Sequence, residues 1–195
     1  MDSVSVTTER GDKGESILAA ALELFAHKGF YGTVMPEVAE LAGVGAGTIY
    51  RHFESKEALV NALYQRWKGV WLETLMKDYP HEAPPQERFK VFWGRATRFV
   101  RDYPLAFKFL ELHHHAPYLD EASRALNEKG CEAGRVFFEE AERLRITKPY
   151  PPWLMLAMTW GMLVGLVKAN QAGGLELTDE VLEQAERCCW DAIRS

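Results

Sequence analysis

The chain has 195 residues, of which 47% are hydrophobic and 26% are charged, so it can bury a large core without disulfide bonds or a metal ion. Its three cysteines are too few, and odd in number, for a disulfide framework, which favours a reducing, cytoplasmic compartment. The formal net charge of −5 argues mildly against nucleic acid as a partner, because DNA affinity comes largely from neutralised phosphates.

The N-terminal segment is expected to be a disordered arm followed by a helix. Residues 1–13 lack the apolar core of a signal peptide and are interpreted as the arm. Apolar side chains then recur at helical spacing from Ile17 to Phe25. Gly29 supplies a left-handed stop, so the first helix is predicted to end near Lys28.

Three further helices follow closely. Thr33 is a suitable N-cap for a second helix, which is predicted to stop at Gly43. A short third helix is expected over residues 46–53, with Ile49 and Phe53 pointing inward. A longer fourth helix, capped by Ser55, extends to about residue 78.

The remaining sequence also predicts helices. Its breaks are marked by prolines and paired glycines, and no segment alternates like a strand. We therefore predict an all-α fold of about nine helices, divided into an N-terminal three-helix domain at residues 14–60 and a larger helical domain at residues 61–195.

Residues 33–53 have the proportions of a DNA-binding helix-turn-helix. The stretch Ala42-Gly43-Val44-Gly45-Ala46-Gly47-Thr48-Ile49-Tyr50-Arg51-His52-Phe53, followed by Ser55-Lys56-Glu57-Ala58-Leu59, resembles the signature of the TetR family of bacterial transcriptional repressors. Leu24-Phe25 and Gly29-Phe30-Tyr31-Gly32-Thr33 also match, so the resemblance covers about residues 14–65.

The resemblance implies a homodimer that binds a double-stranded, palindromic operator and releases it when a small molecule binds. It implies base-edge contacts by Ala46, Gly47, Thr48 and Arg51, and phosphate contacts by Thr33, Tyr50, His52 and Lys56. Gly45 opens the recognition helix where many family members have a serine, so Arg51 is expected to carry more of the discrimination between bases. Phosphate contacts from hydroxyl and amide groups need no net positive charge, which answers part of the charge objection.

Two C-terminal helices are candidates for the dimer interface. Residues 153–169 are apolar on nearly all sides, which a helix tolerates only when it is sandwiched, and the apolar run at 153–167 is shorter than a bilayer span. No membrane is therefore expected as a partner. The interface candidates are Gly161, Gly165, Val181, Ala185, Cys188 and Cys189. The alternative is that both helices are buried within one subunit.

The C-terminal domain is rich in aromatic residues, and the resemblance implies an inducer cavity among its helices. Aromatic side chains with a few polar groups suit a largely apolar ligand, although core packing explains most of them equally well. The ligand-binding candidates are Trp93, Phe107, His114, Phe138 and Trp160.

Two alternatives to a DNA-binding regulator remain. One is a ligand-binding helical dimer without useful DNA affinity, which the acidic balance favours. The other is a metal sensor in which Glu111 shares a helix face with His114 or His115, although this gives two ligands where zinc usually takes at least three from the protein. No catalytic motif is present, so neither an enzyme nor a cofactor is expected.

Overall fold

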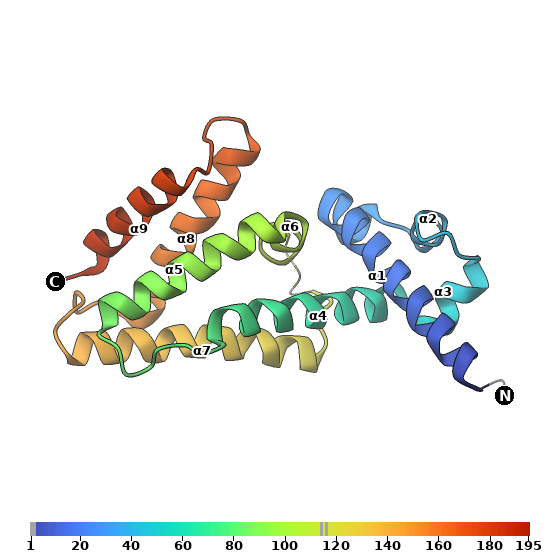
Figure 1. Ribbon diagram of the computed structural model, residues 1–195, viewed down its shortest axis with the longest axis horizontal. Helices are drawn as coiled ribbons and strands as arrows, with labels where there is room; N and C mark the ends of the chain where they lie inside the picture. Colours follow the sequence, from blue (N-terminus) through green and yellow to red (C-terminus); the bar gives the residue numbers. More distant parts are fainter. Residues whose placement is uncertain (1–2, 114, 116) are drawn as a thin grey trace. The chain divides into compact units, whose positions relative to one another are not determined.

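The computed structural model describes residues 3–113, 115 and 117–195, and for residues 3–12 it describes the backbone alone. This part of the chain contains nine helices and no strand, which confirms the all-α prediction (Figure 1). The helices are α1 (Ser3–Gly32), α2 (Met35–Leu41), α3 (Ala46–His52), α4 (Lys56–Met76), α5 (Pro85–Asp102), α6 (Pro104–Leu112), α7 (Glu121–Arg143), α8 (Pro152–Gln171) and α9 (Asp179–Ile193).

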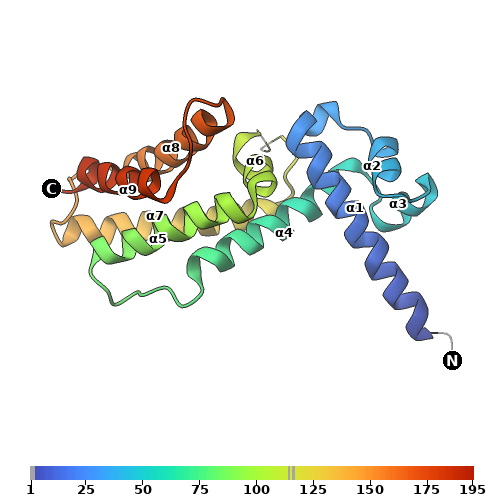
Figure 2. The same cartoon turned by 45° about the horizontal axis from the view of Figure 1, so that its top comes forward.

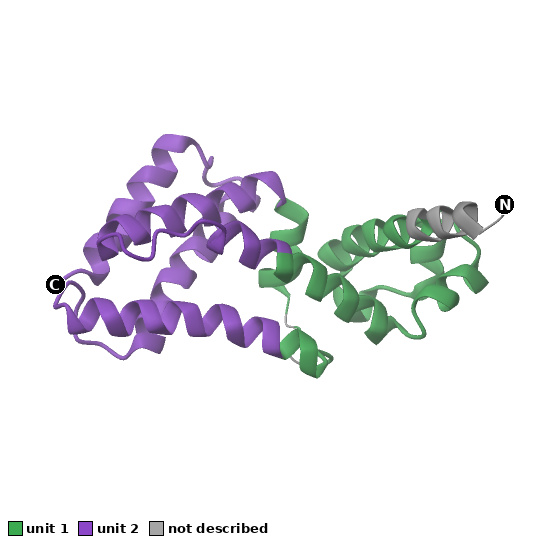
Figure 3. Cartoon of the chain, turned by 60° about the horizontal axis from the view of Figure 1, so that its bottom comes forward, with its two compact units in different colours: residues 1–69, 104–124 green, residues 70–103, 125–195 purple. Residues whose placement is uncertain are grey.

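The chain folds as two compact units (Figure 3). The first comprises residues 1–69 and 104–124, and the second comprises residues 70–103 and 125–195. The division between the units falls inside α4, after residue 69, whereas the sequence placed the domain boundary after residue 60. Helix α6 lies in the N-terminal unit, although the sequence assigned all of residues 61–195 to the C-terminal domain. The reason is packing, because the ring of Phe109 on α6 lies 6.2 Å from that of Phe25 on α1.

Helix α1 differs from its predicted bounds at one end. Its backbone begins at Ser3, within the segment expected to be a disordered arm, and no proline interrupts residues 3–28. At the other end, Gly29 has φ +70° and leaves the helical conformation, so the regular helix ends at Lys28 as predicted. Glycine adopts this left-handed geometry without a steric penalty.

The N-terminal unit builds a small helical head around α1, with α2 and α3 beside it (Figure 2). Its centre is apolar: Phe25, Val38, Ile49 and Leu59 have exposed fractions of 1% or less. Phe53, which was expected to point inward with Ile49, is half-buried. The buried face of α3 therefore fixes which of its side chains face outward.

In the C-terminal unit, α8 is buried on one face only within the single chain, so the predicted burial on nearly all sides is not provided by this chain alone. Met155, Thr159, Leu163 and Val167 are buried, at the spacing of a single helix face. Only 22% of its most apolar 18-residue window is buried, and the helix is long and apolar enough to cross a membrane by length and composition. An apolar surface of α8 therefore remains exposed in the single chain.

Candidate nucleic-acid interface

The turn between α2 and α3 depends on one glycine. Gly43 has φ +66°, and the next residue closes the turn through a 2.9 Å hydrogen bond from the Val44 N–H to the Ala39 carbonyl. Gly45 is the N-cap of α3, and a Cβ added at Gly45 or Gly47 would meet no atom within 4 Å. The front of α3 is therefore free of bulky side chains.

The outward face of α3 agrees with the residues expected to meet DNA. Ala46, Gly47, Tyr50 and Arg51 are exposed. The two remaining candidates on this helix, Thr48 and His52, are half-buried. The helix thus presents small groups beside hydrogen-bonding groups, a surface that suits a major groove.

Thr33 and Lys56, both expected to hold phosphates, face inward in this structure. Thr33 is completely buried, and its hydroxyl donates a 2.8 Å hydrogen bond to the Gly29 carbonyl. The Lys56 ammonium donates to the carbonyls of Phe30 and Thr33. The geometry gives these two phosphate contacts no support, and they remain predictions.

Two of the cations among the described side chains of the N-terminal unit are paired with carboxylates. Lys28 pairs with Glu37 at 3.0 Å, and Arg66 pairs with Glu15 at 2.5 Å. Arg51 lies on the exposed face of α3 and directs one N–H to the Thr48 hydroxyl.

Asn61, which the sequence did not single out, anchors the segment before α7. It is 6% exposed and uses its full hydrogen-bonding capacity. Its amide donates to the carbonyls of Glu57 and Tyr118, and its oxygen accepts from the Asp120 N–H and the Ser123 hydroxyl. The sequence did carry a signal for this role, because Asn61 is a polar residue among the apolar positions of α4.

Helix α6 ends at Leu112, so His113 and His115 lie outside a helix, contrary to the interpretation of the sequence. His115 is buried, with Nε2 against the Phe109 carbonyl and Nδ1 2.8 Å from the Tyr118 hydroxyl. Glu111 forms an ion pair with Lys68 at 3.4 Å. Among the described residues no group of three His, Cys, Asp or Glu is placed to hold a metal ion, and His114 lies outside them.

The five expected ligand residues are not all brought together. Trp93, Phe138 and Trp160 belong to the C-terminal unit, Phe107 belongs to the N-terminal unit, and His114 lies outside the described residues. The Trp93 indole donates a 3.1 Å hydrogen bond to the Leu182 carbonyl, which joins α5 to α9. A buried contact of this kind is explained by core packing as well as by a ligand site.

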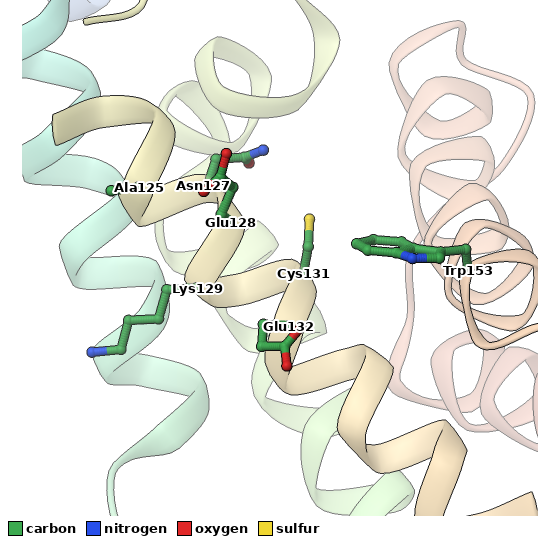
Figure 4. A pocket seen from close by; sticks show the side chains of 7 residues that line it. All are labelled: Ala125, Asn127, Glu128, Lys129, Cys131, Glu132 and Trp153. Atoms are coloured by element: carbon green, nitrogen blue, oxygen red, sulfur yellow. The ribbon is translucent and has the colours of Figure 1, made fainter. Parts of the chain in front are cut away.

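A pocket of about 650 Å³ lies elsewhere in the C-terminal unit, between α7 and the start of α8. In Figure 4 the Cys131 sulfur and the Trp153 ring face each other across it, while the Lys129 ammonium points away. None of the expected ligand residues lines it. Its lining residues are Ala125, Asn127, Glu128, Lys129, Cys131, Glu132 and Trp153.

Five of the six expected interface residues are accessible in the single chain. Gly161, Gly165 and Cys188 are exposed, and Val181 and Ala185 are half-buried. Cys189 was also expected at the interface, but it is 0% exposed. Its burial raises the pKa of the thiol to about 11. It lies on the face of α9 that packs into its own unit, so its side chain is not available to a partner.

Comparison with known proteins agrees with this architecture over residues 17–195. The family model "Bacterial regulatory proteins, tetR family" matches residues 17–63, and the model "Tetracyclin repressor-like, C-terminal domain" matches residues 64–195. The HTH-type transcriptional regulator RutR of Escherichia coli strain K12 is 36% identical over 194 residues, covering 93% of this chain and 91% of RutR.

Solved structures show the same fold. A TetR family transcription regulator from Marinobacter aquaeolei VT8 superposes with a TM-score of 0.84 at 23% identity, covering 97% of this chain and 99% of that one. AibR, solved in complex with isovaleryl coenzyme A and operator DNA, gives a TM-score of 0.76 at 22% identity, covering 91% of this chain and 96% of that one.

Proposed function

The chain belongs to the TetR family of bacterial DNA-binding transcriptional regulators, and from this premise we propose that it is a ligand-responsive repressor that binds a palindromic operator as a homodimer. The observation that carries the proposal is the exposed face of α3, with Tyr50 and Arg51 beside the bare positions Ala46 and Gly47. Two such helices would enter successive major grooves about 34 Å apart.

The roles on α3 follow from side-chain chemistry. Ala46 and Gly47 allow the helix to approach the base edges closely, and Thr48 and Arg51 supply the donors that read them. Tyr50 and His52 flank this face and donate to phosphate oxygens. The helix N-cap at Gly45 keeps the entry to the groove clear.

We propose that a second copy of the chain packs on the exposed face of α8. Trp153, Leu154, Met158 and Met162 form an exposed apolar face, and Gly161 and Gly165 allow another helix to approach closely. The opposite face of α8 packs against its own unit. That unit also contains the polar, half-exposed helix α9, so a protein partner suits the exposed face of α8 better than lipid does. A cytoplasmic location accords with this assignment.

The inducer is proposed to be a small, largely apolar molecule bound in the C-terminal unit. The aromatic content of that unit supports this class of ligand, and the AibR complex gives a precedent for a regulator of this fold with a ligand and operator DNA. Helix α4 contributes residues to both units, so it is the natural route for coupling. Coupling requires only that the ligand favour one of two states by a few kcal/mol.

Selection of binding sites from randomised duplex DNA tests the repressor assignment. We expect the wild-type protein to enrich a palindrome, and Arg51→Ala to lose the preference at one position in each half-site. Binding of the enriched duplex and of random duplex is then compared over a salt series. A wild-type protein that enriches no sequence, but shows thermal shifts with small molecules, would instead be the ligand-binding dimer without DNA affinity.

A further inference from the structure

Lys56, the first residue of α4, directs its side chain to the junction of α1 and α2. Its ammonium donates hydrogen bonds to the Phe30 carbonyl at 2.9 Å and to the Thr33 carbonyl at 3.0 Å. It also lies 4.2 Å from the centre of the Phe30 ring. Three contacts therefore hold one cation to a short stretch of chain that precedes α2.

Electrostatics explains why a lysine occupies this place. A cation in the first turn of α4 opposes the dipole of its own helix. Its partners lie instead beyond the break at Gly29, where the chain has left the regular helix and the carbonyls of Phe30 and Thr33 flank the connection to α2. The Lys56 ammonium therefore ties together Phe30 and Thr33, the two ends of the short connection between the regular part of α1 and α2, from the start of α4.

The junction that Lys56 holds is fixed from other sides too. The Phe30 ring stacks on Tyr118, with ring centres 4.1 Å apart, and the Thr33 hydroxyl bonds to the Gly29 carbonyl. Val34, which follows Thr33, is the N-cap residue of α2. Fixing the Thr33 carbonyl therefore fixes the point from which α2 starts, and α2 in turn packs against α3.

We propose that Lys56 is a positioning residue for operator binding: it sets the orientation of α2 and α3 relative to α4, and it does not neutralise a DNA phosphate. The inference rests on the proposed function, because it assigns a role within operator recognition. A lysine that contacts phosphate adds about one unit to the salt dependence of binding, whereas a positioning lysine adds none.

The experiment compares full-length wild type with Lys56→Met and Lys56→Gln. Both variants lose the charge, but glutamine retains N–H donors for the carbonyls of Phe30 and Thr33. Lys77→Met is the matched control, because it removes an exposed lysine from the C-terminal unit. Affinities for the enriched operator and for random duplex are measured over a salt series, together with the thermal midpoint of each protein.

We expect Lys56→Met to weaken operator binding at least ~10-fold, to leave random-duplex binding within ~2-fold, and to keep the wild-type salt slope. Lys56→Gln should recover part of the operator affinity, and Lys77→Met should bind as the wild type does. Equal losses for methionine and glutamine on both duplexes, with a slope lower by about one, would assign Lys56 to a phosphate and overturn the proposal.

Two other outcomes also count against it. A lower thermal midpoint in both Lys56 variants with unchanged operator affinity shows that Lys56 stabilises the head without orienting α3. Absence of any sequence preference in the wild type removes the proposed function itself, and the positioning role with it. The wild-type selection is read first, so the two failures are distinguished.

Discussion

The guanidinium of Arg51 donates a hydrogen bond to the hydroxyl of Thr48, 3.2 Å away and one turn earlier on α3. Residues three positions apart lie on the same face of a helix, so both side chains address the same part of a groove. An arginine reads guanine through two parallel hydrogen bonds, and this geometry requires the guanidinium plane to be held in one orientation. The hydrogen bond to Thr48 restricts the orientation of the guanidinium before DNA is bound.

Thr48→Val should relax the guanine preference at the base pair that Arg51 reads, and Arg51→Ala should abolish it. The loss of one bidentate contact is worth about 1–3 kcal/mol of discrimination. Site selection followed by sequencing measures the preference at each position, and Thr48→Ser, which retains the hydroxyl, is the control. If Thr48→Val leaves the preference at the base pair read by Arg51 unchanged, the Thr48 hydroxyl does not hold the guanidinium for recognition.

Asn61→Leu should lower the free energy of unfolding by about 2–4 kcal/mol, because it leaves the Tyr118 carbonyl and the Asp120 N–H without partners inside the protein. Urea unfolding followed by circular dichroism gives this value. Gln65→Ala is the control, because Gln65 donates to Asp120 and Ser123 from a less buried position. A loss for Asn61→Leu no larger than for Gln65→Ala would contradict the role of Asn61 as an anchor.

Asp120 should make the protein less stable in acid. A hydrogen bond from the Ser123 N–H, with further ones from the Gln65 amide, lowers the pKa of this carboxyl below its ordinary 3.8. A lowered folded-state pKa contributes stability that is present above pH 3.8 and is lost as the pH falls through the folded value. The contribution is small, because Asp120 is exposed.

The test compares wild type with Asp120→Asn from pH 7 to pH 3. Asparagine also caps helices, so the variant retains the cap of α7 but loses the titration. We expect wild type to be the more stable at neutral pH and the difference to shrink below about pH 4. A difference in unfolding free energy that is constant with pH contradicts the assignment.

Gly29→Ala should destabilise the head by about 1–2 kcal/mol, because an alanine resists the φ of +70° at that position. Gly94→Ala is the matched control: Gly94 lies within α5, and a Cβ there meets no atom within 4 Å. Alanine at that position should raise stability by up to about 1 kcal/mol through helix propensity. Thermal unfolding of the two variants should therefore shift in opposite directions.

Local rules predicted much of the head, and long-range packing decided the rest. The end of the first helix at Gly29 was predicted from the helix stop, and the burial of Ile49 was predicted from helical periodicity. Both are confirmed. Lys56 could not be interpreted in this way, because its carbonyl partners lie 23 and 26 residues away in sequence. For α8, the apolar pattern predicted burial but not which surface lies inside the chain, because hydrophobicity does not distinguish a core from an interface.

Met158→Glu should convert the protein to a monomer. Met158 is 37% exposed on the apolar face of α8, so glutamate is tolerated in the isolated chain, but dimer formation would bury its unpaired charge. Val136→Glu is the control, because Val136 is also exposed but lies on α7. Light scattering after size exclusion gives the molar mass of each protein.

We expect the Val136 variant to remain dimeric and the Met158 variant to lose operator binding together with the dimer, since one recognition helix cannot span two half-sites. A Met158→Glu protein that remains a dimer and binds the operator as the wild type does would place the interface on another surface.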